Sequence, residues 1–227
     1  MKKLFIVITT VSLVSLFVFT QPVYCADLVE KPNRAALMKA ANQGNVLAQY
    51  YLGLDYYRAK NYPSAFQWFT LASKQGDPLS QFMQAYMYYK GFGVEKNYNK
   101  AYILVKPAAE KGNIFACALL GNMYFSGQGV TKNYPDAAKY FNLVISRSKV
   151  VLWTDNTRAQ ATTITEAQYK LAYMYYKGLG VTKNNEKAME LASISAKHGS
   201  SEAKKLVEMM KDDISKINQN VKANELN

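Results

Sequence analysis

The fold of this chain is decided by a nine-residue stretch, YMYYKGFGV at residues 86–94, which recurs almost unchanged as YMYYKGLGV at residues 173–181. A third copy, NMYFSGQGV, lies between them at residues 122–130. The first glycines of successive copies are 36 and 51 residues apart. The longer step is one period plus 15 residues, so the sequence predicts an array of 36-residue repeats with an insertion within residues 146–165.

Each repeat is predicted to contain two helices joined by a short turn. Each helix follows a side chain that can accept hydrogen bonds from the free backbone amides of its first turn. The expected caps of the first helices are Asn45, Asp77, Asn113 and Thr163, and those of the second helices are Asn61, Asn97, Asn133 and Asn184. The Gly-x-Gly-Val turn between the two helices needs the positive φ angles that glycine adopts freely. Pro107 lies near the end of one second helix, where we expect a kink or an early stop.

Helix pairs that each expose an apolar edge must stack to bury it, which predicts an all-α fold. The expected architecture is a right-handed α-solenoid of about four helix-turn-helix repeats. A C-terminal capping helix from about Ser200 to Met210 is expected to close it. The polar C-terminal tail over residues 211–227 is expected to fray.

The N-terminus has the pattern of a secretory signal peptide. Two lysines precede an uncharged apolar run over residues 4–19. Cleavage after Cys25 removes residues 1–25, leaves the solenoid over residues 26–210 and leaves no stable membrane span. The sequence therefore predicts an exported protein, periplasmic or secreted, and an uncleaved membrane anchor is the alternative.

The composition is that of a folded chain with an excess of positive charge. The 227 residues are 49% apolar, which is enough for a core, and carry 28 Lys and Arg against 16 Asp and Glu. Cleavage leaves Cys117 as the single cysteine, so no disulfide is expected within the mature chain. Export and the absence of long Lys and Arg clusters argue against nucleic acid as a partner.

The repeats resemble the SEL-like repeat family, which is related to the tetratricopeptide repeats. The features that carry the resemblance are AQYKLA at residues 167–172, Tyr175, GLGV at residues 178–181, Ala188 and Gly199. The resemblance extends over about residues 35–210, with Gln84 standing where the family usually has leucine. It implies an exported bacterial scaffold or adaptor that binds a protein or peptide partner.

Residues suited to catalysis are few. His198, the single histidine, precedes a glycine at a predicted helix end, where a basic residue complements the helix dipole. Glu110, Asp136 and Glu166 are carboxylates that nothing in the sequence brings together as in a glycosidase. We therefore expect no enzyme, no cofactor and no metal site. An envelope hydrolase or a peptidoglycan-associated regulator is the alternative.

A binding surface is better supported, because the first helix of each pair is rich in tyrosine with Arg or Lys beside it. If these helices line the concave surface, they form a groove suited to recognition. The candidate binding residues are Tyr51, Tyr57, Arg58, Tyr86, Tyr89, Lys90, Phe125, Tyr173, Tyr176 and Lys177. Four of them, Tyr57, Tyr89, Phe125 and Tyr176, are equally compatible with packing between repeats. The recurring positive charge favours an acidic peptide or an anionic envelope glycan.

The insertion carries the apolar run Val150, Val151, Leu152 and Trp153 on a polar background. A long connection in a compact repeat array is either functional or mobile. We expect Trp153 to fold onto an edge of the solenoid or to contact a partner.

Overall fold

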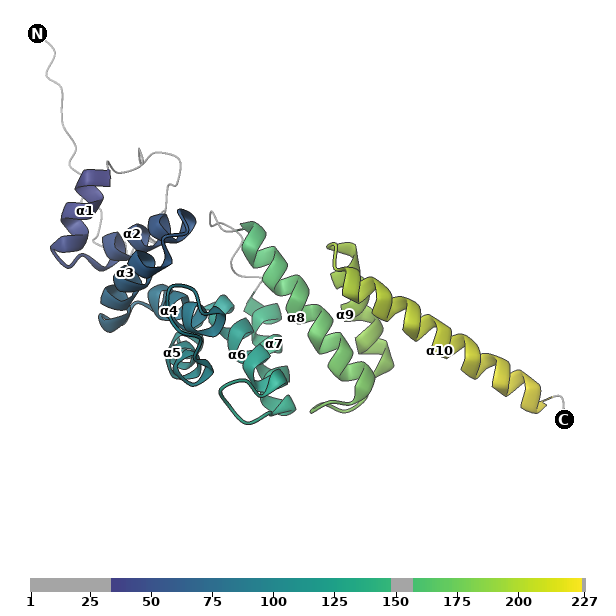
Figure 1. Cartoon of the computed structure of the whole chain (residues 1–227). Coiled ribbons are helices and arrows are strands. Elements are labelled where there is room, and N and C mark those ends of the chain that lie inside the picture. The colour runs from purple at the N-terminus through teal and green to yellow at the C-terminus, as the bar shows by residue number, and fades with distance from the viewer. Residues whose placement is uncertain (1–33, 148–156, 226–227) are drawn as a thin grey trace, which may run out of the picture.

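The computed structural model describes residues 34–147 and 157–225, and the regular secondary structure of these residues is entirely helical (Figure 1). The helices are α1 Arg34–Asn42, α2 Val46–Arg58, α3 Tyr62–Lys74, α4 Pro78–Lys90, α5 Tyr98–Glu110, α6 Ile114–Ser126, α7 Tyr134–Arg147, α8 Thr157–Lys177, α9 Asn185–Lys197 and α10 Ser201–Glu225. This arrangement confirms the predicted all-α solenoid. The predicted signal peptide over residues 1–25 and Trp153 lie outside the described residues.

Four helix pairs form the repeats: α2 with α3, α4 with α5, α6 with α7 and α8 with α9. Each helix packs against its neighbours in sequence, so the chain winds steadily from α1 at one end to α10 at the other (Figure 1). The first helices also touch one another directly, α4 with α6 and α6 with α8. We call α2, α4, α6 and α8 the A helices and their partners α3, α5, α7 and α9 the B helices. The A helices lie on the inner side of the solenoid, and the B helices lie outside them.

Most of the predicted helix starts are confirmed by hydrogen bonds. The side chains of Asn45, Asp77 and Asn113 accept from the backbone amide three residues further on, at 2.7–2.9 Å. The asparagines that precede the B helices do the same at 2.9–3.3 Å. Each such bond satisfies one amide that the helix itself leaves free.

One predicted helix start is wrong, and of the two outcomes expected at Pro107, a kink or an early stop, the early stop does not occur. Thr163 does not begin α8 but lies inside it, and its hydroxyl donates to the carbonyl of Ala159 at 2.9 Å. The helix can start earlier because residues 157–163 contain no glycine or proline. Pro107 does not stop α5, which continues to Glu110. The carbonyl that loses its partner belongs to Ile103, on the solvent side of the helix, where water can replace the bond.

The C-terminal helix is also longer than predicted. The Ser200 hydroxyl accepts from the Ala203 amide at 3.1 Å, as expected for a helix start there. The helix then passes Met210 and runs on to Glu225, since residues 211–225 contain no glycine or proline to end it. Residues 211–225 of the predicted polar tail therefore extend the capping helix.

Close packing within each pair depends on matched side-chain sizes. A Cβ atom on Gly53 would lie 2.7 Å from the Phe69 ring, and one on Gly121 would lie 2.9 Å from the Phe141 ring. In the other two pairs the same positions hold Ala85 with Val105 and Ala172 with Ala192, all fully buried. The two glycines on A helices therefore each accommodate a phenylalanine ring of the B helix, whereas alanines stand opposite smaller residues.

Contacts at both edges of the array fix one repeat against the next. On the edge with the turns from A to B helices, a Cβ on Gly93 would lie 2.5 Å from the backbone of Tyr62 in the preceding repeat. On the opposite edge the Lys111 ammonium donates to the Gly76 carbonyl at 2.8 Å. Such contacts hold the A helices in a fixed relation and therefore make the inner side a preorganised surface.

Candidate functional site

The candidate site is the inner face of the solenoid, which we define as the second, sixth and ninth residues of α2, α4 and α6 with their equivalents in α8. Spacings of four and three residues place these side chains on one side of each helix. The inner face consists of Leu47, Tyr51 and Leu54 of α2, Leu79, Met83 and Tyr86 of α4, Phe115, Leu119 and Asn122 of α6, and Glu166, Lys170 and Tyr173 of α8.

At the first two steps along the inner face, the ninth residue of one A helix and the sixth residue of the next belong to the same hydrophobic cluster. Leu54 and Met83 belong to one hydrophobic cluster, and Tyr86 and Leu119 to another. At the next step the contact is polar, because the Lys170 ammonium donates to the Asn122 side-chain oxygen at 2.6 Å. The inner face is therefore apolar between α2, α4 and α6 and polar between α6 and α8.

The polar contact includes a carboxylate and lies near a tyrosine. Lys170 forms an ion pair with Glu166 at 2.8 Å, and both groups retain some exposure to solvent. Burial raises the pKa of Tyr86, and the Glu166 carboxylate raises it further, so the phenol stays neutral and can donate a hydrogen bond. Donors and acceptors in this arrangement suit the polar backbone of an extended peptide.

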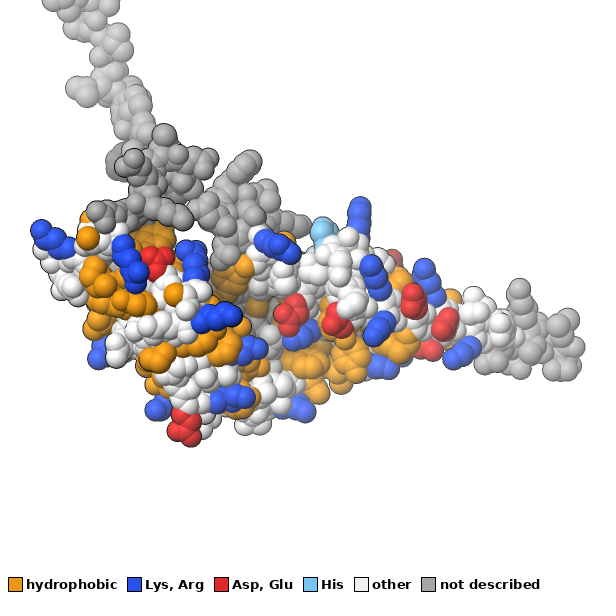
Figure 2. Space-filling model, turned by 45° about the horizontal axis from the view of Figure 1, so that its top comes forward, with side chains coloured by type: hydrophobic (Ala, Val, Ile, Leu, Met, Phe, Trp, Pro, Cys, Tyr) orange, Lys and Arg blue, Asp and Glu red, His pale blue; other side chains and the backbone are white. Residues whose placement is uncertain are grey.

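The N-terminal end of the inner face exposes apolar side chains. Leu47 is 47% exposed, Tyr51 is 41% exposed and Leu79 is 39% exposed. No A helix precedes α2 among the described residues, so Tyr51 lacks the neighbour that covers Leu119 further along. Figure 2 shows hydrophobic side chains gathered on the surface over the N-terminal helices, with Lys and Arg side chains between them.

The structure divides the predicted binding residues into three groups. Tyr51, Tyr86 and Tyr173 lie on the inner face as defined above. Arg58, Lys90 and Lys177 are exposed at the ends of the A helices, where the inner face meets the turns. The third group packs within the molecule and is described next.

Tyr57, Tyr89 and Phe125 pack under the turns. Each ring meets edge-on the tyrosine that begins the B helix of its own repeat, with centroids 5.3–5.5 Å apart. The Tyr89 hydroxyl also donates to the Gln128 side chain of the next repeat at 2.6 Å. Burial raises the pKa of Tyr57 to about 12. These contacts give the three rings a role in joining repeats.

Tyr176 is covered by the C-terminal helix. Its side chain is 8% exposed, and its hydroxyl donates to the carboxylate of Asp213 in α10. This hydrogen bond raises the pKa of Tyr176. The C-terminal end of the solenoid is thus closed by α10, and of the two roles left open for Tyr176 the structure shows packing.

Sequence reasoning missed the polar contact of Asn122, Lys170 and Glu166. The sequence does contain a signal for this contact. The sixth residues of α2, α4 and α6 and the equivalent residue of α8 are Tyr51, Met83, Leu119 and Lys170. Lys170 is the one charged residue of this series. It faces Asn122, which is the one amide among the ninth residues of the A helices. Comparing the repeats position by position would have identified the pair.

The residues suspected of chemistry have structural roles. Cys117 is buried with its thiol 3.6 Å from the Ala109 carbonyl, and burial raises the pKa of the thiol. His198 ends α9 as predicted, with a ring nitrogen 2.8 Å from the Ile194 carbonyl. Within residues 34–147 and 157–225, no three His, Cys, Asp or Glu side chains gather as a metal site would require.

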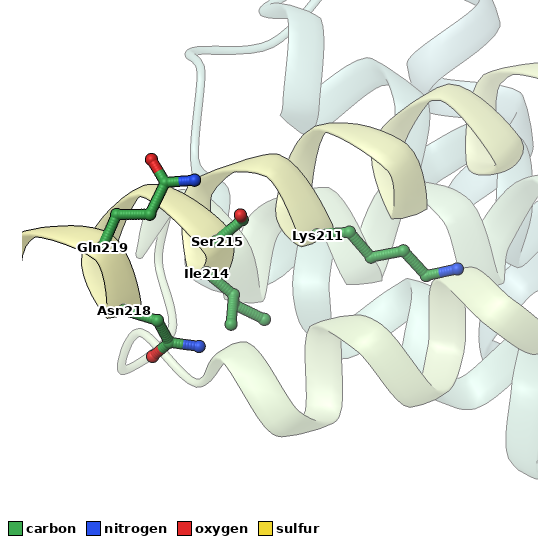
Figure 3. Close-up of a pocket in the computed structure, with 5 residues that line it drawn as sticks. All are labelled: Lys211, Ile214, Ser215, Asn218 and Gln219. Carbon is green, nitrogen blue, oxygen red and sulfur yellow. The ribbon is translucent and has the colours of Figure 1, made fainter. Parts of the chain in front are cut away.

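Two further points concern the described part of the chain. No helix there combines the length and apolarity needed to cross a membrane. The hollow drawn in Figure 3 is lined by Lys211, Ile214, Ser215, Asn218 and Gln219, which all belong to α10. Because a single helix supplies all five side chains, this hollow is an open helix surface and offers no enclosed site for a small molecule.

Comparison with known proteins agrees with the repeat structure. The family model described as Sel1 repeat matches residues 46–77, 78–113, 114–143 and 165–200. The first three matches begin at the first residue of α2, α4 and α6. No curated protein matches the chain in sequence.

Solved structures with Sel1-type repeats are similar over most of this chain. A Sel1 repeat protein from Oxalobacter formigenes is 28% identical, with a TM-score of 0.61 over 78% of this chain and 48% of its own. The protein c5321, a protective antigen of uropathogenic Escherichia coli with an SLR fold, is also 28% identical. Its TM-score is 0.50 over 76% of this chain and 42% of its own. This chain therefore spans about half the length of these relatives.

Proposed function

Because the chain belongs to the Sel1 repeat family, we propose that it is a protein-interaction scaffold that binds its partner along the inner face. The family match favours a scaffold over an envelope hydrolase or a peptidoglycan-associated regulator. The scaffold acts outside the cytoplasm, in the periplasm or as a secreted protein. The support for this location is the basic and apolar pattern at the N-terminus of the sequence.

One observation carries the proposal: the inner face leaves large apolar side chains uncovered at its N-terminal end. Leu47 and Tyr51 of α2 and Leu79 of α4 are exposed apolar side chains of the inner face, on two helices held by the repeat packing. Exposed apolar side chains that gather on one face of a protein favour a contact with another molecule. Tyrosine suits such a contact, since it offers a large area at a small cost in side-chain entropy.

The polar contact further along the inner face adds specificity to this binding. Asn122, Lys170 and Glu166 offer both donors and acceptors, and Tyr86 lies close to them with a neutral hydroxyl. A partner segment that places apolar side chains on α2 and α4 can reach this group with its polar backbone. Matching both regions at once restricts the segments that bind well.

The proposal is tested by crosslinking the exported protein to its neighbours in cells and isolating the complexes. The inner-face variant carries Tyr51→Ala and Leu79→Ala. The matched control carries Leu71→Ala and Ile103→Ala, which remove side chains of similar size that are 44% and 68% exposed on the B helices α3 and α5. We expect a specific partner to be lost from the inner-face variant alone. The same partners in both variants would overturn the proposal.

A further inference from the structure

Positive charge is concentrated on one edge of the solenoid. We define the A–B edge as the turns from A to B helices with their flanking helix ends, residues 56–65, 88–101, 124–137 and 175–188. These segments hold nine Lys or Arg against three Asp or Glu, a net charge of +6. The four complete turns on the opposite edge, residues 39–48, 71–80, 107–116 and 194–203, hold four against three, a net charge of +1.

The charge recurs at a fixed place in the repeat. A lysine stands directly before the capping asparagine of every B helix, at Lys60, Lys96, Lys132 and Lys183. All nine cationic side chains of the A–B edge are exposed. In Figure 1 the α6–α7 and α8–α9 turns lie on the same lower edge of the solenoid, so successive repeats extend one row of charge.

The positive charge of this edge is largely uncompensated. Within the described residues, one of the nine cations lies within ion-pair distance of a carboxylate, Arg58 with Asp55 at 3.9 Å. Six lysines lie over tyrosine rings instead, with 4.4–5.9 Å between the ammonium and the ring centroid. A cation–π contact holds the side chain in place but leaves its charge intact. The Asp136 carboxylate is engaged by the Asn133 amide at 2.7 Å.

The shape of the row indicates an extended and flexible partner. The helices turn along the solenoid, so that α4 and α5 are seen end-on in Figure 1 while α8 and α10 are seen from the side. The turns of successive repeats therefore point in different directions, and a flat surface cannot touch all of them. A flexible chain can follow such a row.

The chemistry of the row indicates a segment without fixed binding geometry. Eight of the nine cations are lysines, whose compact charge lacks the planar fork with which arginine recognises a carboxylate. Lysines spaced along separate turns attract acidic groups without demanding a register. Acidic runs in proteins are typically disordered and serve as interaction tails.

We infer that the A–B edge binds an acidic, extended polypeptide segment of the partner. The inference rests on the proposed scaffold function and adds a second surface to it. The inner face contacts the apolar part of the partner, while the A–B edge holds an acidic segment beside it. Electrostatic attraction along this edge accelerates the encounter and fades as salt increases.

The test uses the purified full chain and labelled poly-L-glutamate of about 30 residues, which reaches ~100 Å when extended. Binding is measured by fluorescence anisotropy. The edge variant replaces Lys60, Lys96, Lys132 and Lys183 by glutamine. The matched control replaces Lys39, Lys74, Lys106 and Lys197 by glutamine. These lysines are exposed outside the A–B edge, and their replacement changes the net charge by the same amount. Circular dichroism confirms that both variants keep their helices.

We expect the edge variant to bind poly-L-glutamate roughly tenfold more weakly than the native chain, and the control to bind within about twofold of it. Equal weakening of the two variants would overturn the inference, because the attraction would then belong to net charge alone. Tighter edge-dependent binding to polygalacturonate of the same charge would assign the edge to a polysaccharide. Edge-dependent binding to vesicles with phosphatidylglycerol, but not to poly-L-glutamate, would assign it to a membrane.

The inference and the proposed function fail in different ways. Suppose that the Tyr51→Ala and Leu79→Ala variant loses a partner, while the edge and control variants bind poly-L-glutamate equally. The scaffold function would then be supported, and the inference of an acidic segment on the A–B edge would be wrong. Weaker poly-L-glutamate binding by the edge variant than by the control, together with partner capture that the inner-face variant does not change, would place binding on the A–B edge. It would contradict the proposed role of the inner face.

Discussion

The same position of the repeat is exposed at one end of the solenoid and buried at the other. The sixth residue of α2, Tyr51, is 41% exposed, whereas the sixth residue of α10, Leu206, is 3% exposed. α10 packs on α8 and α9 and covers Tyr173 and Tyr176, so the C-terminal end is closed. Among residues 34–147 and 157–225, no A helix precedes α2, and within these residues the inner face is uncovered at its N-terminal end.

The exposure of a side chain at this position therefore depends more on the neighbouring helix than on the residue itself. A tyrosine at the same point of the repeat can be a contact for a partner or part of the core. Repeat arrays bury apolar surface only against adjacent repeats, so their ends need either a polar cap or another molecule. α10 supplies the cap at one end, and we propose that a partner covers the other.

The largest expected effect compares a turn inside the array with one at the open end. Gly129 has φ +72°, and an added Cβ would collide with the Tyr98 carbonyl of the preceding repeat. Gly44 has φ +88° and open space around it. We expect Gly129→Ala to lower the free energy of unfolding by about 4 kcal/mol, and Gly44→Ala by about 1 kcal/mol, because only the first adds a collision to the strain. Urea unfolding measures both values. Equal losses would show that the repeats are not joined through this turn.

The next effect concerns the closed end. Met210 of α10 is 2% exposed and packs in the cluster that contains Tyr176, whereas its neighbour Met209 is 40% exposed. We expect Met210→Ala to cost about 3 kcal/mol of unfolding free energy through the lost burial and the cavity left behind. Met209→Ala is the control, with an expected loss under about 0.5 kcal/mol. If the two variants unfold at the same urea concentration, α10 does not close the solenoid as described.

A smaller effect comes from the hydrogen bond that ties α10 to α8. Tyr176→Phe removes the donor to Asp213 and should cost about 1 kcal/mol at neutral pH. The bond raises the pKa of Tyr176, so the folded state holds this proton more tightly than the unfolded state. The stabilisation is therefore present below the unfolded tyrosine pKa of about 10 and is lost as the pH rises through the folded value.

Urea unfolding of the native chain, Tyr176→Phe, Asp213→Asn and the double variant measures this bond. We expect a coupling energy between the two single variants at neutral pH that disappears above the folded pKa. Independent effects of the two substitutions would show that the hydroxyl and the carboxylate do not interact.

The smallest effect on stability is expected at the open end. Tyr51→Ala should change the unfolding free energy by less than about 0.5 kcal/mol, since its side chain is exposed and no helix covers it. The same change should weaken capture of the partner in the crosslinking assay. A stability loss comparable to that of Met210→Ala would mean that Tyr51 is part of the core and that the open end is not a binding surface.

Local chemistry let the sequence predict most of the fold. Asn45, Asp77 and Asn113 cap their helices through bonds to amides three residues away, and such short-range contacts are visible in the sequence itself. The boundaries that failed, the start of α8 and the end of α10, lie where no glycine or proline marks a stop. Helix length there depends on packing and propensity together, which no single residue signals.

The candidate site was less predictable because burial depends on contacts between repeats. The sequence could not show that Tyr51 is more exposed than Tyr57, since both lie on an A helix, although only Tyr57 recurs as an aromatic residue in later repeats. Tyr57 packs against Tyr62, with 5.4 Å between ring centroids, whereas Tyr51 is 41% exposed. The role of Asp213 could not be read at all, because it required α10 to continue beyond the expected end at Met210.

A photo-crosslinking amino acid placed at single sites of the full chain in cells shows whether the partner binds at the N-terminal end of the inner face. The inner-face sites are Tyr51 and Leu79, and the comparison sites are Ile103 on the outer helix α5 and Ile217 on α10, all with exposed side chains. We expect one and the same crosslinked partner from Tyr51 and Leu79, and none from Ile103 or Ile217. A partner crosslinked from Ile103 or Ile217 but from neither inner-face site would contradict this expectation.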